Sequence, residues 1–101
     1  MGGIAGVRVF SGDGVAGATL REMAGRLRHR GPDASGTWVG PDVGLAHTRL
    51  AIIDDEHSHQ PMLSADGRWA LVLDGEILNH ESLRAQLDHP FRSRGDAEVV
   101  L

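Results

Sequence analysis

Cysteine is absent from the 101-residue sequence, which excludes a disulfide framework and thiolate metal ligands. No apolar run approaches the length that crosses a bilayer, and no charged-then-apolar leader opens the chain. We therefore expect no membrane partner and a cytoplasmic location. Positive charge is also scarce, because the formal net charge is −4 and the arginines are scattered rather than arranged in a stripe. This distribution argues against nucleic-acid binding.

Residues that commonly bind metals are concentrated in one polar stretch over 54–61, with the sequence DDEHSHQP. The stretch contains two histidines and three carboxylates, but their spacing matches no known ligand motif. Polar composition is also ordinary for a loop. We therefore expect a loop here and no metal site.

Apolar patterning predicts an α+β domain with antiparallel strands and flanking helices. Strands are expected over residues 4–10, 37–39, 43–53 and 69–73. Apolar residues at helical spacing predict a helix over 18–28, which the Gly31-Pro32 pair ends; they are Leu20, Met23, Ala24 and Leu27. A second helix is expected after Asn79, and a third begins near Asp96.

The strand expected over 43–53 carries polar side chains within an apolar run. Its period of two places Leu45, His47, Arg49 and Ala51 on one face. We interpret His47 as a half-buried imidazole whose hydrogen bonds are satisfied. Arg49 is harder to explain as a core residue, because a buried guanidinium requires a carboxylate partner or a bound anion.

The first residues, MGGIAGV, form a glycine-rich apolar segment that predicts a buried strand. An initiator methionine before a small residue is usually removed, so we expect Gly2 to carry a free α-amino group. A buried terminus is unusual, because chain ends are normally loose. An enzyme that uses its second residue as nucleophile would need Cys, Ser or Thr there, and this sequence has glycine.

A helix that begins near Asp96 would be only about six residues long in this sequence, which is too short to be stable alone. We therefore expect the sequence to cover part of a domain that a further segment or another chain completes. We also expect this part to fold poorly by itself.

Six motifs in this sequence resemble, in order and approximate spacing, those of the N-terminal class II glutamine amidotransferase domain of glutamine-hydrolysing asparagine synthetases. The motifs are GIAGV at 3–7, RHRGPDASGTW at 28–38, GLAHTRLAIID at 44–54, HQPM at 59–62, DGEILNH at 74–80 and GDAEVVL at 95–101. Each motif alone is a weak signal, but the set is specific. Residues 1–101 are therefore identified as a partial domain of this type.

The resemblance implies an N-terminal-nucleophile fold, an αββα sandwich of two antiparallel sheets between helix layers, of which only about the first half is present. It implies a synthetase domain or chain as partner, with ATP and Mg²⁺ bound there and no cofactor in this chain. A homodimer is also possible.

The resemblance also implies a glutamine-binding site. Arg49 would bind the substrate carboxylate, and the pocket would be lined by backbone from Leu50, Ala51, Ile52 and Ile53. Asp74 and Gly75 would stand at the oxyanion position, while Glu76 and Asp96 would hold the substrate amine. These assignments fit the unusual residues of the chain, because a zwitterionic amino acid offers an anion to Arg49 and a cation to the acids.

Two departures from the family pattern affect catalysis. Gly2 replaces the nucleophilic cysteine, and Asp74 replaces an asparagine that could donate a hydrogen bond to an oxyanion. We therefore expect a catalytically degenerate glutaminase-like domain, with glutamine bound weakly if at all, similar to the corresponding domains of β-lactam synthetases. The alternatives are a true glutaminase domain of an asparagine synthetase inactivated at residue 2, and an amino-acid-binding module.

Overall fold

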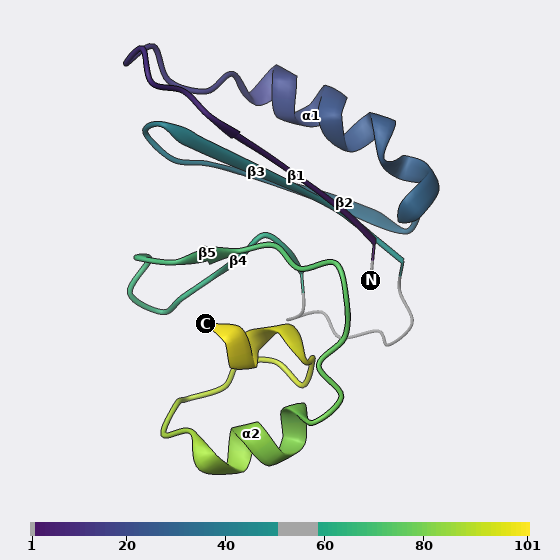
Figure 1. Ribbon diagram of the computed structural model, residues 1–101, viewed down its shortest axis with the longest axis vertical. Coiled ribbons are helices and arrows are strands. Elements are labelled where there is room, and N and C mark those ends of the chain that lie inside the picture. The colour runs from purple at the N-terminus through teal and green to yellow at the C-terminus, as the bar shows by residue number, and fades with distance from the viewer. Residues whose placement is uncertain (1, 51–58) are drawn as a thin grey trace.

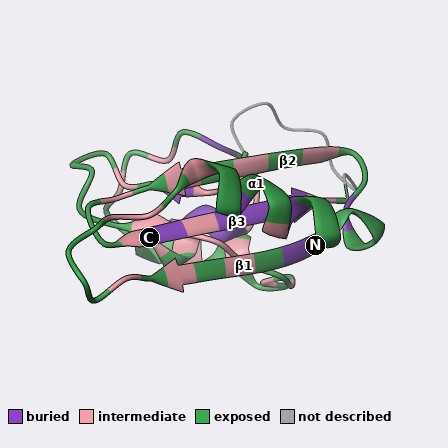
Figure 2. Ribbon diagram, turned by 90° about the horizontal axis from the view of Figure 1, so that it is seen from above, coloured by how far each residue is buried: buried purple, intermediate pink, exposed green. Residues whose placement is uncertain are grey.

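Three antiparallel strands form the larger of two sheets in the computed structural model, which describes residues 2–50 and 59–101 (Figure 1). Strand β3 (Val43–Arg49) lies in the centre, between β1 (Gly2–Arg8) and β2 (Ala34–Val39). Gly2 and Ala34 both pair with Arg49, so the three strands are in register where β3 ends. Figure 2 shows β3 as a largely buried strand between two partly exposed neighbours.

Helix α1 (Gly17–Arg26) packs across one face of this sheet. Its buried residues, Leu20 and Ala24, meet Ala46 of β3 in the hydrophobic core. A Cβ added at Gly44 would lie 2.6 Å from the Leu20 Cδ1 atom, so glycine at this position allows the helix to approach the sheet closely. The stripe predicted from the sequence is therefore the face that α1 buries.

The second sheet pairs two short strands, β4 (Met62–Leu63) and β5 (Ala70–Leu71), on the side of the larger sheet opposite α1. Beyond them lie helix α2 (His80–Gln86) and the 3₁₀ helix η2 (Ala97–Val100). This arrangement of antiparallel sheets and two α-helices confirms the predicted α+β class. It is consistent with part of an N-terminal-nucleophile-type domain. Neither α-helix in residues 2–50 and 59–101 has the length and apolar character needed to cross a bilayer.

Several predicted boundaries need correction. The first strand begins at Gly2 and ends at Arg8, β2 begins three residues before the predicted strand, and β5 is shorter than the predicted one. Strand β3 ends at Arg49, while residues 51–53 lie outside the described part of the chain. Helix α1 ends at Arg26 and is followed by the 3₁₀ helix η1 (Arg28–Arg30), since the chain must turn before Gly31-Pro32.

The helix predicted near Asp96 is the 3₁₀ helix η2, and no side chain caps it. The Asp96 carboxylate instead accepts a hydrogen bond from the Ile77 N–H at 2.6 Å. Asn79 stands at the N-cap position of α2, as predicted, but its side chain makes no capping hydrogen bond. Both polar side chains were therefore placed correctly at element ends, but neither caps its helix.

We expect the isolated chain to have a low melting temperature and a broad thermal unfolding transition. Among the described residues, only five hydrophobic side chains are buried: Leu20, Ala24, Ala46, Met62 and Ala97. The radius of gyration of 14.1 Å also exceeds the value of about 13 Å typical of a compact 100-residue domain. Circular dichroism during heating measures the transition. A sharp, concentration-independent transition in a proven monomer would contradict this prediction.

Candidate functional site

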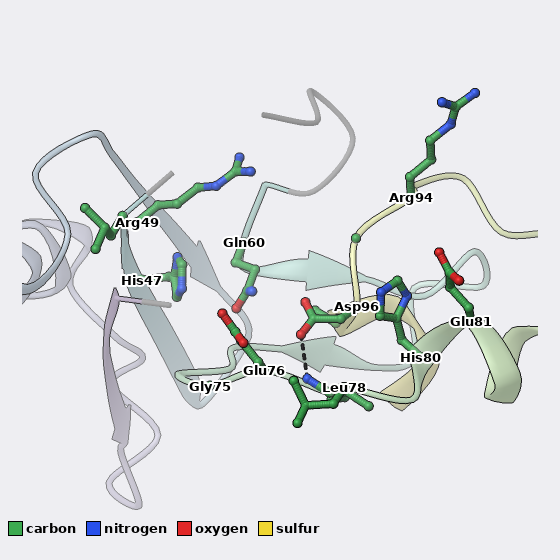
Figure 3. Close-up of a pocket in the computed structure, with 14 residues that line it drawn as sticks. His47, Arg49, Gln60, Gly75, Glu76, Leu78, His80, Glu81, Arg94 and Asp96 are labelled. Carbon is green, nitrogen blue, oxygen red and sulfur yellow. Dashed lines mark hydrogen bonds between the residues drawn. The ribbon is translucent and has the colours of Figure 1, made fainter. Parts of the chain in front are cut away.

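A cavity of about 370 Å³ lies between β3, the segment that follows β5, and the segment that leads into η2 (Figure 3). Five residues that the sequence predicted for the site line this cavity: Arg49, Leu50, Gly75, Glu76 and Asp96. They come from three segments that are distant in the sequence. Ala51, Ile52 and Ile53 lie outside the described residues, so their predicted place along the pocket is not tested.

The alternation of β3 explains why polar side chains reach the cavity. Ala46 belongs to the core under α1, and the Thr48 hydroxyl donates to the Leu27 carbonyl oxygen at 3.2 Å on the same side. His47 and Arg49, which alternate with these two residues along β3, project to the other face of the sheet, where they line the cavity. The shared face that the period of two predicted is therefore confirmed for these two residues.

Both positively and negatively charged side chains line the cavity. Arg49 stands on β3, while Glu76 and Asp96 belong to the two segments that face this strand. The hydrogen bond between Asp96 and the Ile77 N–H ties these two segments together. Such an arrangement can bind a zwitterion, because it offers a guanidinium for a carboxylate and carboxylates for an ammonium group.

Asp74 is absent from the cavity lining and is bound to residues from the start of the chain and from η1. Its Oδ1 atom accepts the Gly2 N–H at 3.1 Å, and its Oδ2 atom accepts from Arg30 Nη2 at 2.7 Å. Arg30 Nε also donates to the Gly2 carbonyl oxygen at 3.1 Å. The hydrogen bond from Gly2, together with Arg30, holds the pKa of Asp74 below its usual value, so its carboxylate is ionised near neutral pH.

Gly2 is buried, in agreement with the prediction that the first strand carries it inward. A Cβ added at this residue would overlap the carbonyl oxygen of Thr48 on the paired strand. Any larger residue at position 2 therefore requires the backbone of β1 to move. The position that would hold the nucleophile in the resembled family has no room for a side chain in this arrangement.

The cavity also contains residues that sequence reasoning did not assign to the site. They are His47, Gln60, Ile77, Leu78, His80, Glu81, Arg94, Gly95 and Ala97. His47 is 3% exposed, so the prediction of a half-buried imidazole understated its burial. Its Nε2 atom has no hydrogen-bond partner among the described residues, which contradicts the prediction of a satisfied imidazole. Only its place on the same face as Arg49 could have signalled a role in the site.

A buried carboxylate organises the segment that carries Asp96. Glu98 is 3% exposed and accepts hydrogen bonds from the Arg92 N–H at 2.9 Å and the Ser93 N–H at 2.8 Å. Its Oε2 atom also lies 3.2 Å from His89 Nε2. Burial alone would raise the pKa of Glu98, but its hydrogen bonds with Arg92, Ser93 and His89 outweigh burial and lower it.

Arg84 of α2 holds the same segment through its carbonyl oxygens. Its Nη1 atom donates to the Ser93 carbonyl oxygen at 2.7 Å, and its Nη2 atom donates to the carbonyl oxygen of Gly95. The guanidinium also stacks on the Phe91 ring, 4.7 Å from its centroid. Glu98 and Arg84 together fix the backbone that precedes Asp96.

We expect Glu98→Gln to release this segment. The amide keeps the shape of the side chain but removes the charge that two N–H donors share, so amide exchange at Arg92 and Ser93 should accelerate by about 10- to 100-fold at pH 7. Since the folded pKa of Glu98 is lowered, its stabilisation is present above the unfolded pKa and disappears as the pH falls through the folded pKa. The difference between wild type and variant should therefore shrink in acid.

Hydrogen exchange followed by NMR measures this effect, with Glu22→Gln as the matched control because its carboxylate is 71% exposed. Equal exchange at Ser93 in wild type and Glu98→Gln would show that the carboxylate does not hold the segment.

Comparison with known proteins gives a consistent result. The family model described as "Glutamine amidotransferase domain" matches residues 1–101. The asparagine synthetase (glutamine-hydrolyzing) of Triphysaria versicolor is 49% identical over 80 residues, which cover 78% of this chain and 14% of that relative. Asparagine synthetase (glutamine-hydrolyzing) 1 of Arabidopsis thaliana and the Zea mays protein of the same description are each 48% identical over 80 residues, with the same coverage. The chain thus spans about 14% of the length of these relatives.

Proposed function

The chain belongs to the glutamine amidotransferase family, and from this premise we propose that its cavity binds glutamine without hydrolysing it. The observation that carries the proposal is the convergence of Arg49, Glu76 and Asp96 on one cavity of about 370 Å³. Arg49 would bind the α-carboxylate, and the two acids would bind the α-ammonium group. Gly75 would offer its backbone to the carboxamide end.

The absence of hydrolysis follows from position 2. Amide hydrolysis by this family's route requires a nucleophile at the start of the chain, and Gly2 has no side chain. The overlap of a Cβ with the Thr48 carbonyl oxygen supports a backbone adapted to glycine rather than an active site altered by one substitution. We therefore favour a degenerate glutaminase-like domain over an inactivated glutaminase.

The relatives suggest the wider context. They are asparagine synthetases, and this chain matches about one seventh of their length. We propose that the domain supports an ATP-dependent, Mg²⁺-requiring ligase that forms an amide bond, in which the cofactors bind outside this chain. The synthetase portion would also complete the core, which is small in the described residues.

Calorimetric titration of the chain with L-glutamine tests the proposed binding. We expect weak, saturable binding, accompanied by no release of glutamate in the same sample. The absence of a binding signal at millimolar protein and ligand would contradict the proposal.

A further inference from the structure

The imidazole of His47 has a feature that the proposed function does not explain. It is 3% exposed, it lines the cavity, and its Nε2 atom has no hydrogen-bond partner in the described part of the chain. Buried polar atoms without a partner are uncommon, because the lost hydration is costly. Figure 3 shows the ring projecting from β3 on the same side as Arg49. The arrangement suits a ligand that supplies the missing hydrogen bond.

The chemistry of the ring determines what the ligand must offer. A hydrogen bond to the Leu73 backbone raises the pKa of the His47 ring, as a carbonyl acceptor does. Because the Leu73 N–H donates to Gln60 and Nε2 has no partner, we assign this bond to Nδ1 as the donor, so Nδ1 carries a hydrogen. Burial lowers the pKa of His47, and the nearby Arg49 acts in the same direction, although the bond to Leu73 and the charge of Asp74 oppose it. The ring is therefore neutral near pH 7, and Nε2 presents a lone pair to the cavity.

The place of His47 along the strand indicates which part of the ligand it meets. It lies two residues before Arg49 on the same face, a separation of about 6.5 Å along a strand. A ligand whose α-carboxylate is held by Arg49 can therefore have its other end near His47. The ammonium group has other acceptors in the cavity, Glu76 and Asp96.

We propose that His47 determines the ligand specificity of the pocket by accepting a hydrogen bond from the carboxamide N–H of glutamine at Nε2. This inference rests on the proposed function. Glutamate has a carboxylate at the same point, which accepts hydrogen bonds and cannot donate one when ionised. His47 thereby favours glutamine over glutamate, while Arg49 and the acids hold groups that the two amino acids share.

The test compares the affinities of L-glutamine and L-glutamate for wild type and for His47→Asn. Asparagine can keep a donor for the Leu73 carbonyl oxygen but cannot reach the position of Nε2. We expect the wild type to prefer glutamine, and His47→Asn to reduce the ratio of the two affinities by about five- to tenfold, the value of one hydrogen bond. His47→Gln, which can place an acceptor at the position of Nε2, should restore part of the ratio.

His59→Asn is the matched control, because His59 is exposed and is not part of the cavity lining. It should leave the ratio unchanged. An unchanged ratio in His47→Asn, with both ligands still bound, would overturn this inference and leave the proposed function standing. Loss of both affinities in equal proportion would also overturn it, since His47 would then contact a group common to both ligands.

A measurement on the unliganded chain tests the same inference independently. The ¹⁵N spectrum of the His47 ring near pH 7 should show Nδ1 with a hydrogen and Nε2 without one, and the Nε2 signal should shift when glutamine is added. A hydrogen on Nε2 would overturn the inference. If the wild type binds neither amino acid, both the inference and the proposed function fail.

Discussion

Gly2→Cys alone should release no more than a trace of glutamate from glutamine, and the unmodified chain should release none. Glycine has no nucleophile, and a restored thiol would need a Cβ at the place where the Thr48 carbonyl oxygen stands. The tetrahedral intermediate also requires hydrogen-bond donors, and removal of one such donor typically costs about 10²–10³ in rate. Asp74 cannot donate, because its lowered pKa keeps it ionised near neutral pH.

The double variant Gly2→Cys with Asp74→Asn should come closest to activity when the rest of the domain is supplied. Asparagine can accept the Gly2 N–H through its oxygen, as Asp74 does. Its NH₂ group then replaces the Oδ2 atom that accepts from Arg30, so the Arg30 side chain must move away before this group can donate to an oxyanion. The two changes should be strongly non-additive, because nucleophile and oxyanion donor act on one transition state. An enzymatic assay for glutamate measures each variant.

Asp74→Asn alone is the control, and it should be as inactive as the wild type. Full activity in Gly2→Cys alone would show that Asp74 does not occupy the oxyanion position. Glutamate release by the unmodified chain would show that the domain is not catalytically degenerate.

Arg49→Ala should reduce glutamine affinity by about 10- to 100-fold, because a hydrogen bond to a charged group contributes about 1.5–3 kcal/mol. In the wild type, the Arg49 guanidinium would bind the α-carboxylate, a group that every L-amino acid carries. The affinities for glutamine and glutamate should therefore fall in similar proportion, whereas the substitution of His47 should change the affinity for glutamine more than that for glutamate. Calorimetric titration measures both ligands.

Arg68→Ala is the matched control, because it removes the same charge from an exposed position outside the cavity lining. It should bind glutamine as the wild type does. Equal glutamine affinity in wild type and Arg49→Ala would show that Arg49 does not bind the carboxylate.

The sequence predicted the features of the fold that depend on local periodicity. The stripe containing Leu20 and Ala24 identified the buried face of α1, and the alternation of β3 placed His47 and Arg49 on one face. Strand β4 was missed because a two-residue pairing leaves almost no periodic signal, and the strand follows directly after Pro61.

The sequence predicted some of the residues that line the cavity, but it also selected Asp74, which lies outside the lining, and it did not predict the contacts. The family motifs selected Arg49, Gly75, Glu76 and Asp96, which line one cavity, although their roles stay predictions. The ion pair between Asp74 and Arg30 joins residues 44 positions apart, a pairing that no local pattern encodes. The missing partner of His47 Nε2 was likewise invisible, since hydrogen-bond satisfaction depends on the tertiary arrangement.

The most direct test of a pocket that binds glutamine without hydrolysing it is one NMR experiment with L-glutamine labelled with ¹³C at the carboxamide carbon. The chain should broaden or shift the carboxamide signal in a saturable way, and no carboxylate signal of glutamate should appear over long incubation. An unperturbed glutamine signal would contradict binding. Steady growth of a glutamate signal in proportion to the concentration of the chain would contradict the loss of catalysis.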